Sequence, residues 1–179
     1  YYNGEYYDIK EDRLASRYGK SSFSGGSQII AQNMLPRKYA KIASYSALAI
    51  AAASGLVLQF YFKTGIYTIP LGFAGIFFGF FYSSPPFRWV KRGLGELFIG
   101  FCYGWLPIST AYYIQTQNFS SIANWVSIPV ALTIFNVILL NEFPDLKADI
   151  ETGKRHLVAR MGTSNAVYLY IIVVLLTWI

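Results

Sequence analysis

The sequence predicts an all-α fold, a polytopic bundle of transmembrane helices, on three observations. Of its 179 residues, 54% are hydrophobic and only 13% are charged, and the mean hydropathy is +0.36. Soluble domains carry about 25% charged residues. Long stretches contain no charged residue, and the charged residues gather between them on one side of the predicted bundle. This pattern excludes a soluble protein, and a single cysteine, Cys102, excludes an intrachain disulfide.

The charge-free runs predict the helices in order. These runs cover residues 42–62, 64–87, 97–141 and 161–179. About 20 helical residues cross the hydrocarbon layer of a bilayer, so the first, second and fourth runs each supply one span. The third run is too long for one crossing, and the polar stretch "TQNFSS" divides it into two helices. We therefore expect five spans, at about 40–62, 66–82, 95–115, 121–140 and 165–179.

The chain is expected to form a single transmembrane domain, residues 1–179. It begins without Met, at "YYNGEYYD", and it stops within an apolar run at Ile179. From these two ends we expect a fragment of a larger membrane protein, truncated at both ends. No signal peptide is visible in the sequence.

The charged residues indicate the orientation in the membrane. If the five spans alternate, one side holds residues 1–39, 83–94 and 141–164, and 14 of the 15 Lys and Arg residues lie on or beside it; Lys63 is the exception. The positive-inside rule makes that side cytoplasmic, in the plasma or inner membrane of a prokaryote. All nine acidic residues also lie on or beside that side, which this rule does not explain. The simple alternative is that longer loops have more room for charge.

Two acidic motifs with the same spacing lie at opposite ends of the chain. Asp8 and Asp12 form D-x-x-x-D within "GEYYDIKED", and Asp145 and Asp149 repeat it within "NEFPDLKAD". Residues i and i+4 share a helix face, where like charges repel by a few tenths of a kcal/mol. Mg²⁺ would offset this repulsion, because it prefers oxygen ligands and bridges carboxylates to phosphates. The alternative is two solvated helix faces neutralised by neighbouring lysines.

A diphosphate held by such ions also needs cationic side chains. Lys91 and Arg92 are favoured, because the preceding "SPPF" stiffens the backbone. Arginine can bind phosphate oxygens bidentately, whereas lysine acts as a point charge. For each cation, orientation in the membrane or contact with lipid headgroups is the alternative. The remaining candidates are Arg13, Arg17 and Lys20 after the first motif, Arg88 in the middle loop, and Lys154 and Arg155 after the second motif.

At these residues the sequence resembles a known family. "NEFPDLKADIETGKRHLVARMG" resembles the second signature of the UbiA-type intramembrane prenyltransferases, N-x-x-x-D-x-x-x-D followed by G-K-R-T-L and R-x-G. "GEYYDIKED" resembles their first signature, with Gly4 where that signature has Asn. "YSSPPFRWVKRGLGELFIGFCYGWLPISTAYYIQTQ" and "FSGGSQII" resemble the 1,4-dihydroxy-2-naphthoate polyprenyltransferase branch. His156 replaces the usual Thr, and we expect it to be a loop side chain in water.

The resemblance implies a fold, an activity and a site. The chain would match a nine-helix fold from the loop after helix 2 into helix 7. The activity would be Mg²⁺-dependent transfer of a polyprenyl group from its diphosphate to an aromatic acceptor. Asp8, Asp12, Asp145 and Asp149 would be catalytic through the metal, and Asn141 would join them as a ligand. The substrate diphosphate would contact Arg13, Arg17, Lys20, Lys91, Arg92 and Lys154.

Several alternatives to a naphthoate prenyltransferase remain. The acceptor could be 4-hydroxybenzoate, homogentisate or a glycerol-phosphate lipid. A non-catalytic lipid-binding or transport protein is a different class, although transporters place ionisable groups near the membrane midplane, where this chain has none. A CDP-alcohol phosphotransferase is excluded because the sequence contains no Asp-Gly pair. The expected partners are the two substrates and the lipid bilayer, with no nucleic acid.

Overall fold

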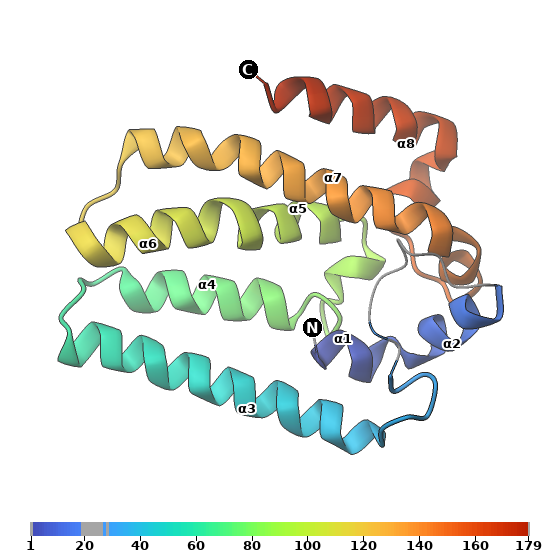
Figure 1. Cartoon of the computed structure of the whole chain (residues 1–179), viewed down its shortest axis with the longest axis horizontal. Helices are drawn as coiled ribbons and strands as arrows, with labels where there is room; N and C mark the ends of the chain where they lie inside the picture. The colour runs from blue at the N-terminus through green and yellow to red at the C-terminus, as the bar shows by residue number, and fades with distance from the viewer. Residues whose placement is uncertain (1, 19–26, 28, 179) are drawn as a thin grey trace.

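The computed structural model describes residues 2–18, 27 and 29–178, and within these ranges the regular secondary structure is entirely helical. Four helical stretches are long and apolar enough to cross a membrane (Figure 1), which confirms the predicted class. The elements, in order, are α1 (Tyr2–Tyr7), α2 (Ile9–Tyr18), α3 (Arg37–Leu56), the π-helical η1 (Val57–Tyr61), α4 (Thr68–Phe80), the 3₁₀ turn η2 (Trp89–Lys91), α5 (Gly95–Gly100), the π-helical η3 (Phe101–Trp105), α6 (Leu106–Thr116), α7 (Ser121–Glu151) and α8 (Leu157–Leu176).

Three helix boundaries differ from the sequence expectation. The predicted span 66–82 forms α4, which has 13 residues and is shorter than the four candidate spans. The expected end at residue 140 was wrong, because α7 continues to Glu151 and is 31 residues long. It therefore extends about 46 Å at 1.5 Å per residue, beyond a hydrocarbon layer of about 30 Å. The last helix begins at Leu157 instead of residue 165, with a kink at Gly162, whose φ is 81°.

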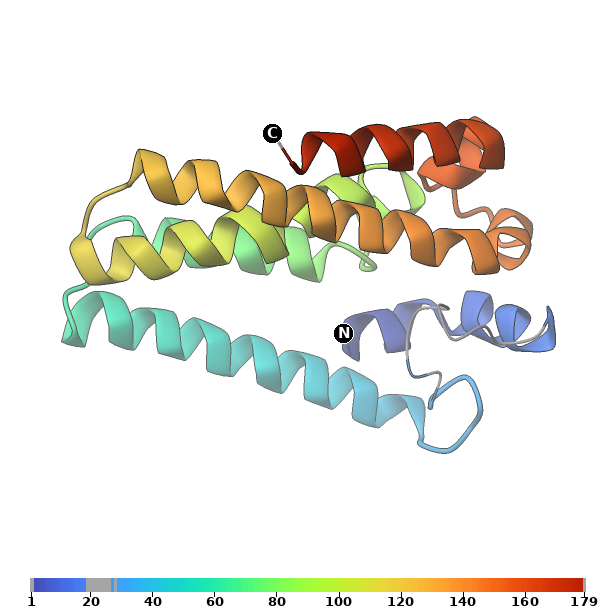
Figure 2. The same ribbon diagram turned by 45° about the horizontal axis from the view of Figure 1, so that its top comes forward.

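Helix α7 organises the bundle, packing against α2, α5, η3, α6 and α8. Figures 1 and 2 show α3, α4, α6, α7 and α8 running side by side, with α1 and α2 at one end of the bundle. One apolar cluster is centred on Leu71, Leu106 and Tyr113, and another on Leu139, Val158 and Ala166. Many large apolar side chains face outward, as expected of a surface in contact with lipid.

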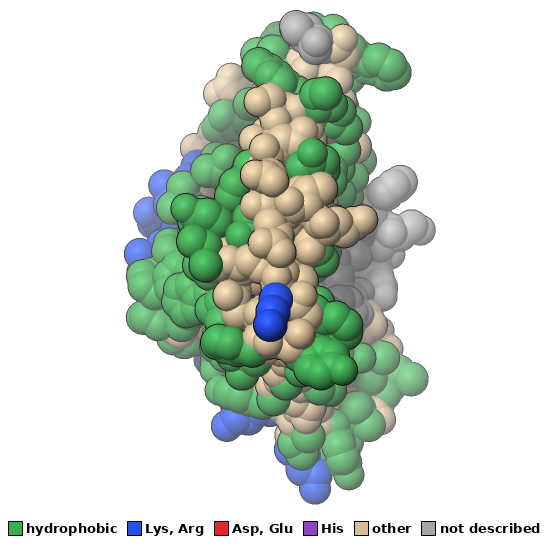
Figure 3. Space-filling view, turned by 90° about the vertical axis from the view of Figure 1, so that its left-hand side faces the viewer, with side chains coloured by type: hydrophobic (Ala, Val, Ile, Leu, Met, Phe, Trp, Pro, Cys, Tyr) green, Lys and Arg blue, Asp and Glu red, His purple; other side chains and the backbone are tan. Residues whose placement is uncertain are grey.

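The two ends of the bundle differ in charge. The turns after η1 and α6 form the end opposite α1 and α2. Viewed from that end, the surface is apolar or uncharged apart from scattered basic side chains, and no acidic side chain is visible (Figure 3). Both acidic motifs line one cavity beside α1 and α2, at the other end of the bundle, as the alternation of spans predicts.

Glycines allow α5 and η3 to approach α7 closely. A Cβ atom added to Gly100 would lie 2.9 Å from the carbonyl oxygen of Ala131, and one added to Gly104 would lie 2.3 Å from the Cα of Ala131. Small residues permit such backbone contact between membrane helices. This seam places the first turns of α5 beside the polar part of α7.

Candidate active site

A cavity of about 460 Å³ lies between α1, α2, the end of α4, α5, η3 and α7. Both acidic motifs reach it, although they are more than 130 residues apart in sequence. Its polar lining includes six carboxylate side chains and a single basic one, Lys154, among the described residues. The polar lining residues are Asn3, Glu5, Asp8, Glu11, Asp12, Tyr82, Ser83, Asn141, Asp145, Asp149 and Lys154.

The first motif lies across the junction of α1 and α2. Helical spacing is kept through this junction, because the amide of Asp8 donates to the carbonyl of Gly4 at 2.8 Å and that of Asp12 donates to the carbonyl of Asp8 at 2.9 Å. The Asp8 carboxylate accepts from Ser83 Oγ at 2.7 Å and pairs with Arg88 at 2.9 Å. Burial raises the pKa of Asp8, although the charge of Lys154 opposes this. Burial and the adjacent Asp8 charge raise the pKa of Asp12 to about 7.

The second motif occupies the last three turns of α7. Asn141, Asp145 and Asp149 are spaced four residues apart and all line the cavity. After the helix ends, Gly153 adopts a φ of 75°, and the amide of Lys154 donates to the carbonyl of Asp149 at 2.8 Å. This turn returns the Lys154 ammonium to within 3.2 Å of the Asp149 carboxylate. Burial lowers the pKa of Lys154, but the charges of Asp149 and Asp8 outweigh it and raise the pKa.

The donor set of the cavity fits a hard divalent cation. Carboxylate and amide oxygens from both motifs line one space, and these are ligands that Mg²⁺ prefers. No hydrogen bond or ion pair reaches the Asp12 carboxylate from the described residues, so its charge lacks a direct partner. Asp8, Asp12, Asn141, Asp145 and Asp149 are the residues that would hold the ion, and their role as ligands stays a prediction.

Most of the predicted diphosphate cations lie outside the cavity. Only Lys154 lines it. Lys91 pairs with Glu11 at 2.7 Å, and the exposed Arg92 donates to the carbonyl of Pro86 at 3.2 Å. On the surface of α2, Arg13 and Arg17 are exposed, and Arg13 donates to Ala31 and Asn33. Lys20 lies outside the described residues. Of the middle-loop cations, Arg88 and Lys91 thus bind the first helices, and Arg92 binds its own loop.

Sequence reasoning missed the contacts that hold α1 and α2 in place. Asn3 donates to the carbonyl of Phe80 at 2.6 Å and also to Ser84, so its amide attaches α1 to the end of α4. Glu5 accepts from the amide and hydroxyl of Ser27 at 2.8 and 2.7 Å. Glu11 is buried beside Lys91 and Arg88. The available signal was an excess of acids around the first motif beyond its two aspartates.

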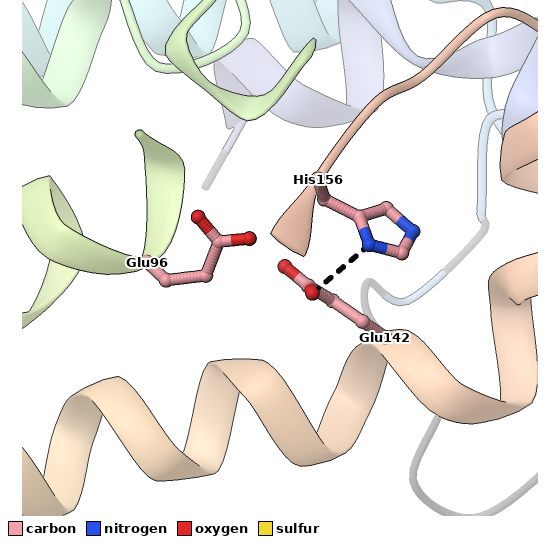
Figure 4. A group of neighbouring side chains, drawn as sticks. All are labelled: Glu96, Glu142 and His156. Carbon is pink, nitrogen blue, oxygen red and sulfur yellow. Dashed lines mark ion pairs between the residues drawn. The ribbon is translucent and has the colours of Figure 1, made fainter. Parts of the chain in front are cut away.

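The expectation for His156 was wrong. Its side chain is 1% exposed, and it contacts two acids instead of water. Nδ1 lies 2.9 Å from Glu142 (Figure 4), and Nε2 lies 3.2 Å from Asp149. Burial lowers the pKa of His156, but these two carboxylates outweigh it and raise the pKa to about 9. A histidine in a charged loop gave no signal of burial, because its partner Glu142 belongs to a different helix.

The other part of the cavity is apolar. Its lining side chains come from α4, α5, η3 and α7, and they are Phe78, Phe98, Ile99, Cys102, Tyr103 and Ile138. Phe78 and Phe98 stack with their ring centroids 4.4 Å apart. The cavity therefore joins an acidic end to an apolar wall. This arrangement suits a ligand with an anionic head and an apolar tail.

Residues 3–179 match the UbiA prenyltransferase family. The chain belongs to that family. It is 37% identical over 102 residues to UbiA prenyltransferase domain-containing protein 1 of Dictyostelium discoideum, covering 57% of this chain and 31% of that protein. It is 36% identical over 88 residues to 2-carboxy-1,4-naphthoquinone phytyltransferase of Synechocystis, a match that covers 49% of this chain and 29% of that protein. It is 27% identical over 165 residues to 1,4-dihydroxy-2-naphthoate octaprenyltransferase of Bacillus subtilis, a match that covers 92% of this chain and 51% of that protein.

These UbiA relatives confirm the resemblance seen in the sequence, including its naphthoate branch. The matched part of the chain spans at most about half the length of these relatives. No solved structure matches the chain. Family membership and the four long apolar helices make this UbiA chain an integral membrane protein.

Proposed function

We propose that the protein containing this chain transfers a polyprenyl group from a polyprenyl diphosphate to an aromatic acceptor, with Mg²⁺ as cofactor. The favoured acceptor is 1,4-dihydroxy-2-naphthoate, as in menaquinone- or phylloquinone-type quinone biosynthesis. Membership of the UbiA family supports the reaction class. The names of the relatives from Synechocystis and Bacillus subtilis support a naphthoate-type acceptor.

One observation carries this proposal: both acidic motifs line the same cavity, and that cavity continues into an apolar wall. Burial of an isoprenoid in an apolar site is favourable by about 0.8 kcal/mol for each CH₂ group. The diphosphate would therefore lie at the acidic end and the prenyl chain along the wall formed by Phe78, Phe98 and Ile138. On the positive-inside rule, the acidic end faces the cytoplasm.

In the reaction, the allylic C–O bond breaks and its electron pair leaves with the diphosphate. Mg²⁺, when bound, would neutralise the diphosphate and stabilise the charge that develops on the leaving oxygen. Lys154 would add a positive point charge at the same end. The aromatic wall would exclude water and place ring faces near the allylic cation. The acceptor ring forms the new C–C bond, then loses a proton or, with naphthoate, CO₂.

The test is consumption of a radiolabelled polyprenyl diphosphate by the purified protein with a panel of acceptors, with and without Mg²⁺. Asp8→Ala and Asp145→Ala are expected to abolish turnover while the protein still inserts in membranes. Lys10→Ala is the matched control, because Lys10 is exposed on α2 and does not line the cavity. Near-normal turnover in either aspartate variant would contradict the role of that motif.

The acceptor panel separates the alternatives. Product formed only with hydroxybenzoate, homogentisate or a glycerol-phosphate lipid would replace naphthoate as the acceptor while keeping the reaction class. Binding of the polyprenyl diphosphate without turnover of any acceptor would favour a non-catalytic lipid-binding or transport protein.

A further inference from the structure

A buried cluster of Glu96, Glu142 and His156 lies behind the second acidic motif, and none of the three lines the cavity. They come from α5, from α7 and from the loop before α8 (Figure 4), and one ligand-type atom of each lies within 4.8 Å of the others. Glu96 and His156 are 1% exposed and Glu142 is 8% exposed. Burying two carboxylates is costly without partners, so the cluster needs an explanation.

Part of that explanation is the N-terminus of α8. The amide of Leu157 donates to Glu96 at 2.7 Å, that of Val158 donates to Glu142 at 3.4 Å, and that of Ala159 donates to Nδ1 of His156 at 3.2 Å. The first amides of a helix lack partners within the helix and carry partial positive charge. The two carboxylates therefore fix the start of α8 against α5 and α7.

The remaining contacts run from this cluster to the cavity. Nδ1 of His156 lies 2.9 Å from Glu142, and Nε2 lies 3.2 Å from the Asp149 carboxylate, which lines the cavity; the second contact is at ion-pair distance without hydrogen-bond geometry. Asp149 in turn lies 3.2 Å from the Lys154 ammonium. His156 thus connects Glu142, outside the cavity, with Asp149 and, through Asp149, with Lys154 inside it.

We propose that Glu96, Glu142 and His156 are positioning residues that hold Asp149 and Lys154 in the geometry that binds the metal–diphosphate group. This inference rests on the proposed function. Asp149 has a flexible side chain at the last turn of α7, and Lys154 follows a glycine. His156 restricts Asp149 from one side, while Glu96 and Glu142 fix the loop that carries Lys154. Partners behind metal ligands typically change metal affinity or activity 10- to 100-fold when they are replaced.

The three side chains also have the composition of a divalent metal site, and Glu96 Oε2 is buried without a hydrogen-bond partner among the described residues. The geometry favours the positioning role. A metal would need the lone pair of His156 Nδ1, yet that nitrogen already accepts from the amide of Ala159 at 3.2 Å and lies 2.9 Å from the Glu142 carboxylate. The positive end of α8 also opposes a cation there.

The test measures binding of Mg²⁺ with inorganic diphosphate by titration calorimetry on the purified protein in detergent, without an acceptor. His156→Gln cannot bridge both acids, and we expect about 10- to 100-fold weaker binding. Glu142→Gln should give a loss of similar size, and the double variant should lose little more than either single variant, because the pair acts as one unit. The control is Lys147→Gln, an exposed basic side chain of α7 that does not line the cavity, which should bind normally.

Each outcome decides between the explanations. Normal binding by folded His156→Gln overturns the inference, as does additive loss in the double variant. If His156→Gln does not fold, Glu142→Gln carries the same expectation. A stoichiometric transition metal in the purified protein that disappears in Glu96→Gln overturns it in favour of a metal site. Failure of the unsubstituted protein to bind would overturn the proposed function and this inference with it.

Discussion

Lys91 offers the sharpest test of the structure against the sequence pattern. The sequence favoured Lys91 as a ligand of the diphosphate, whereas the structure pairs it with Glu11 at 2.7 Å, outside the cavity lining. We predict that Lys91→Met destabilises the fold because it leaves Glu11 without its nearest cation. The Glu11 side chain is 6% exposed, and its next cation, Arg88, lies 3.8 Å away.

The magnitude follows from the partial exposure of the pair. Breaking a fully buried ion pair costs about 3–5 kcal/mol. The Lys91 side chain is 23% exposed and Arg88 remains near Glu11, so solvent and the second cation reduce the loss to about 2 kcal/mol. For a domain of this size that corresponds to a fall in melting temperature of about 4–8 °C.

The assay is thermal unfolding in detergent for Lys91→Met, Glu11→Gln and the double variant. The cycle should give a coupling free energy of about 1–2 kcal/mol, since each single change removes the same contact. The KM for the polyprenyl diphosphate should change little in the folded fraction. An unchanged melting temperature together with a several-fold higher KM would refute the structural role and restore Lys91 as a diphosphate ligand.

Three further predictions concern the helix seam and the metal. Gly104→Val should lower the melting temperature sharply, because the added Cβ would lie 2.3 Å from the Cα of Ala131. Gly72→Ala should leave the melting temperature unchanged, because the space around Gly72 is open. Equal effects of the two variants would contradict close packing of Gly104 against α7. Since the pKa of Asp12 is raised to about 7 and Mg²⁺ requires the carboxylate, Mg²⁺ affinity should rise from pH 6 to pH 8; a flat calorimetric profile would argue against Asp12 as a ligand. Asp145→Asn should weaken Mg²⁺–diphosphate binding at least about tenfold without loss of folding; unchanged affinity in the same titration would remove Asp145 from the ligand set.

The sequence was sufficient for features that depend on neighbours along the chain. Charge-free runs predicted the long helices, because the length of an apolar run sets what can cross a bilayer. The spacing of Asp145 and Asp149 predicted a shared helix face, and α7 provides it.

Features that depend on distant partners were beyond sequence reasoning. His156 is buried because Glu142 and Asp149 surround it, and its loop is held by Glu96, which lies 60 positions earlier. Lys91 is drawn toward Glu11, 80 positions away. Neither pairing leaves a periodic pattern in the sequence. The sequence therefore predicted that the His156 side chain lies in water and that Lys91 binds the diphosphate.

The contact between Gly104 and Ala131 has a consequence for engineering substrate preference. Backbone meets backbone there, with no intervening side chains that could be trimmed or repacked to let the two helices move apart. On the proposed function, room for a bulkier prenyl chain would therefore come from shortening the wall itself, at Phe98 or Phe78, and a library of variants directed at the seam would yield misfolded protein instead of altered selectivity.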